Sequence, residues 1–210
     1  MERKIYSYSK ISSFEQCPLK FKYRYIEKII PKIDKTIESH LGKCVHSALE
    51  WLYSNVKHGK IPTIDELISF YLQKWEDDYF PEIPIMDERL TARDYLNKGI
   101  GFLVAYYLEN KPFNDNTLEV EKEISINLDL DGEYKIKGFI DRLSFNQATG
   151  EYEIHDYKTS NNLPRIEKIE NDKQLSLYSI AIKELFGYDK DVKLIWHYLA
   201  HNKKIFRKKT

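Results

Sequence analysis

The chain has 210 residues, of which 42% are hydrophobic and 14% aromatic, enough to form the core of one globular domain. It carries 33 basic and 33 acidic residues, so the overall charge gives no reason to expect tight nonspecific binding of nucleic acid. The sequence contains no apolar run of about 20 residues and starts with polar residues, so we expect a cytoplasmic protein without a membrane partner.

The charges are distributed unevenly along the chain. Residues 1–60 carry twelve Lys and Arg against six Asp and Glu, and residues 161–210 carry eleven against six, so the span between them is acidic. The basic flanks could supply contacts to phosphate groups, and the acidic centre could hold cations. The same distribution is typical of a solvated surface, and the sequence leaves both interpretations open.

The first part of the chain has helical periodicity. Aromatic residues at helical spacing predict a helix over residues 9–29 that is interrupted near Pro18. A second helix is predicted from about residue 42 to residue 56.

Two further helices are predicted before residue 111. Thr63 followed by Glu66 forms the pattern of a capping box, which predicts a helix that extends to about residue 80. Two prolines end that helix, and another is expected over residues 87–110.

At Thr117 the periodicity changes from helical to alternating. Apolar residues at alternate positions predict a half-buried strand over residues 117–128, with Glu119, Glu121 and Glu123 together on its other face. The turn-forming pair Asp131-Gly132 favours antiparallel pairing with the next strand.

The remaining elements are predicted from the same patterns. Two strands, residues 134–145 and 152–158, are separated by a short turn-rich loop and are expected to pair. Residues 160–171 have the composition of a loop. A helix over residues 172–186 ends at a glycine, and a fourth strand covers residues 192–200.

Two acids and one lysine fall on the paired strands. Asp156 and Lys158 are two residues apart, so their side chains leave an extended strand on the same side. Pairing across the hairpin would bring Asp141 within reach of Asp156. Carboxylates that converge in this way suit a hard divalent cation, which can support hydrolysis of a phosphodiester.

These residues also form a known pattern. Gly138-Phe139-Ile140-Asp141 followed by Asp156-Tyr157-Lys158 resembles the active-site signature of the PD-(D/E)XK nuclease superfamily. Other segments resemble its RecB-like exonuclease branch, which includes the CRISPR-associated RecB-like exonucleases. In that branch's order, they are Ser7-Tyr8-Ser9-Lys10-Ile11 with Cys17-Pro18-Leu19-Lys20-Phe21 and Tyr25, then Gly42-Lys43-Cys44-Val45-His46, Glu121, and Gln174-Leu175-Ser176-Leu177-Tyr178.

The resemblance implies an α/β fold. Its core would be restriction-endonuclease-like, with a mixed four-stranded sheet flanked by helices. Residues 1–210 would form a single PD-(D/E)XK nuclease domain, with a helical insertion at about residues 57–116. The order of helices and strands predicted from periodicity agrees with this topology.

The resemblance also implies a metal site. Asp141 and Asp156 would bind Mg²⁺ or Mn²⁺, together with the backbone carbonyl of Tyr157 and the side chain of His46. Imidazole suits a softer ion than carboxylate oxygen does, so His46 would shift the preference toward manganese. Considered alone, His46 could instead be a histidine of the apolar core.

Four more residues receive roles from the resemblance. Lys158 would orient or help to deprotonate the attacking water and would stabilise developing charge. Glu121 would bind the metal through water or through a second ion. Gln174 and Tyr178, one helical turn apart, would position the substrate phosphate. Lys158 could instead only pair with an acid, and Glu121 could be solvated.

The implied function is metal-dependent hydrolysis of DNA, with an exonuclease acting on duplex ends or single strands in DNA repair, recombination or CRISPR-type defence. DNA would be the main partner, and a helicase or a defence-complex subunit a second one. The alternative is a non-catalytic nucleic-acid-binding or scaffolding module of a larger complex. Many RecB-like members hold an iron–sulfur cluster through a cysteine at the position of Cys17 and three later ones. These three are absent, so we predict no iron–sulfur cluster.

Overall fold

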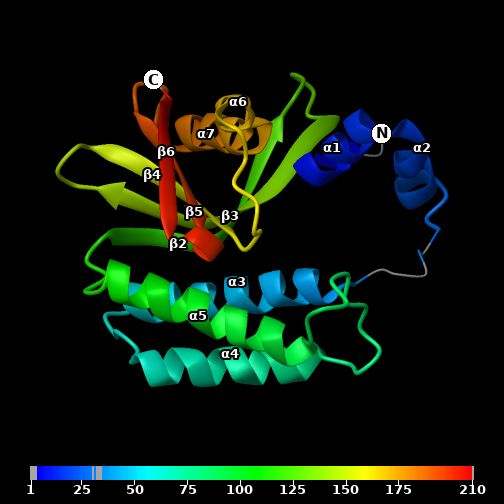
Figure 1. Cartoon of the computed structure of the whole chain (residues 1–210). Helices are drawn as coiled ribbons and strands as arrows, with labels where there is room; N and C mark the ends of the chain where they lie inside the picture. The colour runs from blue at the N-terminus through cyan, green and yellow to red at the C-terminus, as the bar shows by residue number, and fades with distance from the viewer. Residues whose placement is uncertain (1–3, 30, 32–34, 210) are drawn as a thin grey trace.

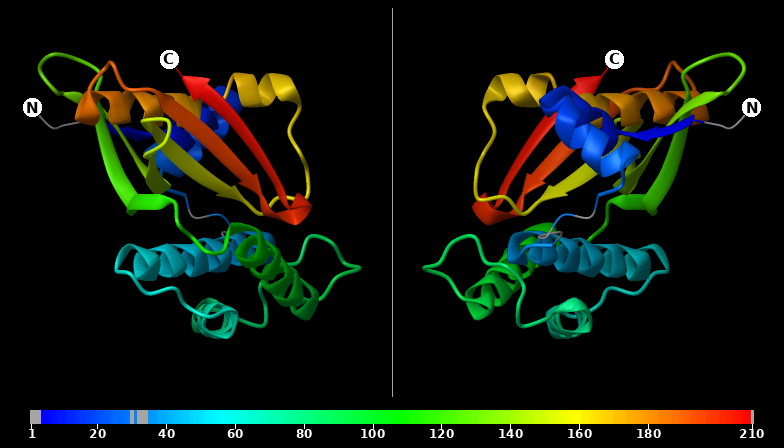
Figure 2. Two further views of the ribbon diagram at one scale, coloured as in Figure 1. Left: turned by 90° about the vertical axis from the view of Figure 1, so that its left-hand side faces the viewer. Right: turned by 90° about the vertical axis from the view of Figure 1, so that its right-hand side faces the viewer.

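The computed structural model describes residues 4–29, 31 and 35–209. A mixed sheet lies between two groups of helices, with α3 against one face, α4 and α5 packed on α3, and α7 on the other face (Figure 1). The helices α1 and α2 lie at one end of the sheet, as the two rotated views show (Figure 2). The predicted α/β fold, a sheet flanked by helices, is confirmed.

The elements have the following bounds. The helices are α1 (Tyr8–Gln16), α2 (Pro18–Phe21), a π-helical turn (Lys22–Ile26), α3 (Ile37–Lys57), α4 (Ile64–Asp78), α5 (Ala92–Asn110), α6 (Ile166–Glu170), α7 (Lys173–Phe186) and a 3₁₀ turn (Leu199–His201). The strands are β1 (Lys4–Ser7), β2 (Asn116–Asn127), β3 (Tyr134–Asn146), β4 (Glu151–Lys158), β5 (Val192–Tyr198) and β6 (Lys203–Lys209). In the described residues, no helix combines the length and the apolar character that crossing a membrane requires.

The pairing of β3 leaves a gap in the sheet. β2 pairs antiparallel with β3 along most of its length and occupies one edge. Two strands share the other edge of β3. β1 pairs with β3 only up to Lys137, and β4 pairs with it only from Arg142 onward. Residues 138–141 therefore have no partner strand on that edge. β4 continues the sheet through a parallel pairing with β5, and β6 pairs antiparallel with β5.

Capping boxes start the three long helices. The predicted box of Thr63 and Glu66 is present at α4, and Thr91 caps α5 in the same way. The second helix begins at Ile37, five residues before the predicted start, because Thr36 and Ser39 form a third capping box. α3 thereby gains an additional turn and a half against the core.

Two buried clusters hold the layers together. One lies between α3, α4 and α5 and includes Leu49, Leu52 and Leu103. The other lies between the sheet and α7 and includes Ile154 and Trp196. Each buried leucine or isoleucine side chain contributes about 1.5–3 kcal/mol relative to an exposed one.

The structure adds three elements to the predicted ones. β1 and β6 bring the sheet to six strands, two more than the four predicted. Both lie at edges of the sheet, and β6 is rich in lysine, so neither shows the apolar alternation of a buried strand. The predicted loop of residues 160–171 contains the short helix α6.

The strict alternation predicted for β2 is wrong in its centre. Leu118 and Ile124 pack in the cluster beside α7, whereas Val120 packs in the helical cluster on the other face. Two irregularities change the face of the sheet to which the side chains point. One is a bulge between Thr117 and Glu119, and the other is a left-handed backbone at Glu121, with φ of 44°. Glu121 is therefore not one of three equivalent glutamates.

Candidate metal centre

Asp141 lies at the gap in the edge of β3, where α3 and β4 reach it. The backbone N–H of Tyr157 donates a hydrogen bond of 2.9 Å to Asp141 Oδ2. His46 of α3 places Nδ1 3.4 Å from the same oxygen and donates from Nε2 to the carbonyl of Tyr157 at 2.8 Å. His46 and Asp141 therefore bring a ring nitrogen and a carboxylate oxygen to the same point.

Glu121 completes a group of three ligand atoms. One atom each from His46, Glu121 and Asp141 lie within 4.8 Å of one another. The register of the flanking pairs places Glu121 opposite Asp141, and the left-handed backbone at Glu121 directs its side chain away from a regular strand position. Such a conformation costs a non-glycine residue about 1–3 kcal/mol and is concentrated at functional sites.

The three side chains carry uncompensated negative charge. Burial raises the pKa of Glu121 to about 7, and the charges of Asp141 and Glu50 add to the shift. His46 acts in the opposite direction but does not cancel them. An imidazole nitrogen and two carboxylates at these separations fit a small divalent cation, which would remove the repulsion between the acids.

Asp156 and Lys158 form a pair next to this group. Lys158 Nζ lies 2.7 Å from Asp156 Oδ2, so the buried carboxylate is held in an ion pair. Burial raises the pKa of Asp156, and Asp141 adds to the shift although Lys158 opposes it. Burial acts to lower the pKa of Lys158, but Asp156 outweighs this effect and the pKa is raised, so the ammonium group stays charged.

The structure therefore separates the predicted metal ligands into two sets. His46, Glu121 and Asp141 form the compact group, and the carbonyl of Tyr157 adjoins it through its bond to His46. Asp156 lies beside this group with its Oδ2 turned toward Lys158.

Gln174 and Tyr178 lie on α7, across the gap from the metal group. Gln174 Nε2 donates to Tyr178 Oη at 3.2 Å. The Tyr178 ring rests on Gly138, where an added Cβ would lie only 2.6 Å from Tyr178 Oη. Gly138 is therefore required because a side chain there would displace the tyrosine.

A groove of about 590 Å³ begins at these residues and runs between α1 and β3. We call it the α1–β3 groove. Its lining combines hydroxyl groups, cations and aromatic rings: Ser7, Ser9, Ser12 and Ser13; Lys20, Arg24 and Lys137; Tyr8, Tyr25 and Phe139. Ser13 Oγ is buried and has no hydrogen-bond partner. The groove therefore offers polar and stacking contacts beside the metal group.

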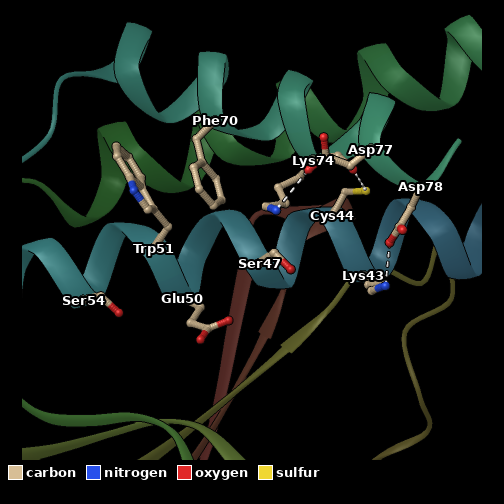
Figure 3. Close-up of a pocket in the computed structure, with 10 residues that line it drawn as sticks. All are labelled: Lys43, Cys44, Ser47, Glu50, Trp51, Ser54, Phe70, Lys74, Asp77 and Asp78. Carbon is tan, nitrogen blue, oxygen red and sulfur yellow. Dashed lines mark hydrogen bonds and ion pairs between the residues drawn. The ribbon is translucent and has the colours of Figure 1, made fainter.

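A second groove, of about 500 Å³, lies between α3 and α4 (Figure 3). Trp51 and Phe70 stack at one end, with ring centroids 4.9 Å apart. At the other end there are two ion pairs, Lys43 with Asp78 and Lys74 with Asp77. Glu50 points from α3 toward the strands, away from α4 (Figure 3). The two lysines of this groove are paired with two of its acids, and the residues of the metal group do not line it.

The two cysteines lie apart from the metal group. Cys17 is exposed between α1 and α2, and Cys44 is buried in α3 beside the second groove, where its thiol contacts the Lys74 carbonyl at 3.5 Å. Burial raises the pKa of Cys44 to about 11, so the thiol is protonated.

Sequence reasoning missed a buried polar network behind the metal group. Arg142 is 1% exposed and donates from Nε to Tyr157 Oη at 3.0 Å and from Nη2 to His155 Nδ1 at 2.8 Å. His155 Nδ1 also lies 2.9 Å from His197 Nε2. One sequence signal was available, since Arg142 directly follows Asp141 and lies between the apolar residues Ile140 and Leu143, and a buried cation needs partners.

A family model described as the PD-(D/E)XK nuclease superfamily matches residues 5–209, which is nearly the whole chain. No curated protein matched the chain.

Proposed function

Because the chain belongs to the PD-(D/E)XK nuclease superfamily, we propose that it is a metal-dependent deoxyribonuclease that acts as an exonuclease on duplex ends or single strands. Nucleases of this superfamily use divalent metal ions, and the superfamily implies DNA as the substrate. The observation that carries the proposal is the convergence of His46, Glu121 and Asp141 within 4.8 Å of one another.

The residues present fit the proposed cofactor, Mg²⁺ or Mn²⁺. His46, Asp141 and the carbonyl of Tyr157 would hold it, with Asp156 turning from Lys158 to join them and Glu121 acting directly or through water. A divalent cation held by such ligands lowers the pKa of a bound water and neutralises charge on the phosphate. We infer manganese as the better ion, because the site includes an imidazole.

Lys158 supports the chemistry through its charge. Its raised pKa keeps the ammonium protonated, so in this state it stabilises negative charge on the phosphate and orients water by donating hydrogen bonds. It could accept a proton from water only after it has left Asp156 and lost one of its own protons. The same 2.7 Å pair therefore links the position of the acid to the role of the lysine.

The α1–β3 groove supports the preference for single strands and ends. It lies beside Gly138, and its aromatic lining, including Tyr8 and Tyr25, offers rings on which unpaired bases can stack. Lys20 and Arg24 can contact the backbone phosphates. Gln174, held by Tyr178, would position the phosphate that approaches the gap in β3.

We further assign the protein to the RecB-like exonuclease branch. The support is that His46, Glu121 and Gln174 with Tyr178, the branch-like patterns of the sequence, all lie around Asp141 or Gly138. We treat residues 1–210 as one domain with a helical insertion at residues 57–116, since α3 both supplies His46 and packs on α4 and α5. Roles in repair, recombination or CRISPR-type defence, a cytoplasmic setting and a helicase or defence-complex partner complete the proposal.

A nuclease assay tests the proposal. Purified protein is incubated with labelled single-stranded and duplex DNA in Mn²⁺, in Mg²⁺ and in EDTA. We expect degradation from ends in Mn²⁺, less in Mg²⁺ and none in EDTA, and Asp141→Ala and Lys158→Ala should each reduce it at least about 100-fold.

Asp189→Ala and Lys190→Ala are the matched controls. They remove an acid and a lysine that form a surface pair with a separation of 2.7 Å, so both should retain full activity. Degradation that survives both Asp141→Ala and Lys158→Ala would show that the site is wrong. A native chain that degrades no DNA in either metal would favour a non-catalytic module.

A further inference from the structure

Phe139 is an apolar side chain in charged surroundings. It lies on β3 with 52% of its surface exposed, within residues 138–141, which have no partner strand on one edge. Its neighbours on the same face of β3 are Lys137 and Asp141, and Glu123 of β2 lies opposite it. None of these is an apolar residue, so cross-strand packing gives a phenylalanine little stability at this position.

Strand geometry sets the position of Phe139 relative to the metal group. Gly138 faces α7, where Tyr178 packs on it, and Asp141 faces His46 of α3. Side chains alternate along a strand, so Phe139 shares the face of Asp141 and lies about 6.4–6.8 Å from it along the strand. His46 covers Asp141, whereas Phe139 is open to solvent. A nucleotide whose phosphate reaches the metal group can therefore place its base at the Phe139 ring.

Phe139 also lines the α1–β3 groove. The π-helical turn contributes Arg24 and Tyr25 to the same groove, and Lys137 lines it next to Phe139. The ion pair of Lys137 with Glu123 is exposed, so it contributes little and the lysine can exchange its partner for a phosphate. The groove thus offers a ring for a base and cations for the backbone around one position.

An unpaired base is the group that fits such a ring. Stacking of a base on an aromatic side chain contributes about 1–3 kcal/mol and tolerates every base, because each base has a π-face. In a duplex both faces of a base are covered by its neighbours, so a paired nucleotide must be unstacked, at a cost in free energy, before it can use the ring. A ring beside a phosphate-cutting group therefore selects unpaired nucleotides.

We propose that Phe139 is a specificity-determining residue of the site, on which the base of the nucleotide next to the cleaved phosphate stacks. The substrate is thereby a strand with an unpaired base at the point of cleavage, and purines, which stack more strongly, are preferred to pyrimidines there. The inference rests on the proposed function, because it takes the phosphate at the metal group to be the one that is cut.

Fluorescence anisotropy with the full chain in EDTA tests the stacking without catalysis. The probes are labelled single strands of equal length, namely oligo-dA, oligo-dT and a strand of abasic units. We expect the native chain to bind oligo-dA most tightly and the abasic strand most weakly. Phe139→Ala should weaken binding of oligo-dA about tenfold. The abasic strand should bind both proteins equally, since it brings no base to the ring.

Matched variants separate stacking from a general loss of apolar surface. Phe139→Trp keeps a ring and should bind oligo-dA at least as tightly as the native chain does. Phe139→Leu keeps an apolar side chain without a ring and should lose most of the affinity that Phe139→Ala loses. Phe206→Ala removes another exposed ring, on β6 and outside the groove, and should change nothing. If circular dichroism shows that Phe139→Ala does not fold, the result for Phe139→Leu decides.

A digestion assay locates the stacked base relative to the cut. Single strands with one abasic unit at a known position are digested in Mn²⁺, and the products are resolved by length. The native chain should pause at one fixed spacing from the abasic unit, where the missing base would have lain on Phe139. Phe139→Ala should be slower at every position and should show no such pause.

Three results would overturn the proposal: no saturable binding of oligo-dA by the native chain, the same affinity for oligo-dA in Phe139→Ala, or an equal loss on the abasic strand. An unchanged pause in Phe139→Ala would do so as well. Because the anisotropy measurement needs no catalysis, its failure is distinct from failure of the nuclease assay. Base-dependent binding through Phe139 by a chain that cuts no DNA would keep the stacking and remove the proposed function.

Discussion

The acidic group around Asp141 predicts that Glu121→Gln stabilises the metal-free protein. Glu121 has a pKa raised from 4.5 to about 7 by burial and by neighbouring acids. An acid with a raised pKa in the folded state binds a proton more tightly there than in the unfolded chain. Stability is therefore lost as the pH rises from about 4.5 to about 7, and the full penalty applies above pH 7.

The size of the effect follows from the shift. A change of this size corresponds to at most ~3.4 kcal/mol. Glu121 is only half-buried, so solvent screening reduces the expected penalty to about 1–2 kcal/mol. Glu121→Gln removes the charge and should raise the free energy of unfolding by this amount at pH 8. At pH 4.5 the acid is protonated in the folded state and half-protonated in the unfolded one, so the gain should be at most about 0.4 kcal/mol.

Urea unfolding in EDTA at the two pH values measures the effect. Glu123→Gln is the control, because Glu123 lies on the same strand but is exposed and paired with Lys137, and its change should stay within about 0.5 kcal/mol. Adding Mn²⁺ should stabilise the native chain more than Glu121→Gln, since the cation replaces the missing positive charge. Equal stability of Glu121→Gln and native chain at pH 8 in EDTA would refute the reasoning.

Three further outcomes are expected. Gly138→Ala should destabilise the protein by about 1–3 kcal/mol in urea unfolding, because its Cβ would meet the Tyr178 ring. This cost should nearly vanish in a Tyr178→Ala background. Gly101→Ala is the control: its Cβ has open space, so it should instead stabilise the protein by about 0.5–1 kcal/mol. His46→Ala should lower activity in Mn²⁺ more than in Mg²⁺, and an unchanged ratio of the two rates would exclude His46 as a ligand. Thr91→Ala should cost about 1 kcal/mol in unfolding experiments through loss of the α5 cap.

The sequence predicted the elements whose signals are local. Capping by Thr63, the helix that ends at Gly187 and the strands of the central hairpin are present in the structure. The start of α3 was misplaced because Thr36 and Ser39 cap it without a glutamate. β6 was missed because edge strands do not need a buried face, and its lysines gave no strand period.

The candidate site was predictable only in part, for a similar reason. The resemblance named Asp141, His46 and Glu121, and these side chains converge in the structure. The backbone that brings Glu121 to the other two is a left-handed residue beside a bulge, which no local propensity of glutamate favours. The network of Arg142 and His155 depends on pairing across strands, so its members look unrelated in the sequence.

The gap in the β3 edge explains why the proposed site and groove meet where they do. A fully paired strand would leave no room for side chains from outside the sheet at its edge. Because β1 pairs only up to Lys137 and β4 only from Arg142, the β4 backbone can reach the Asp141 carboxylate, while Tyr178 packs on the face of the sheet at Gly138. A DNA strand in the α1–β3 groove would therefore arrive at Gly138, three residues before Asp141, so its phosphate would reach the acids without crossing another strand.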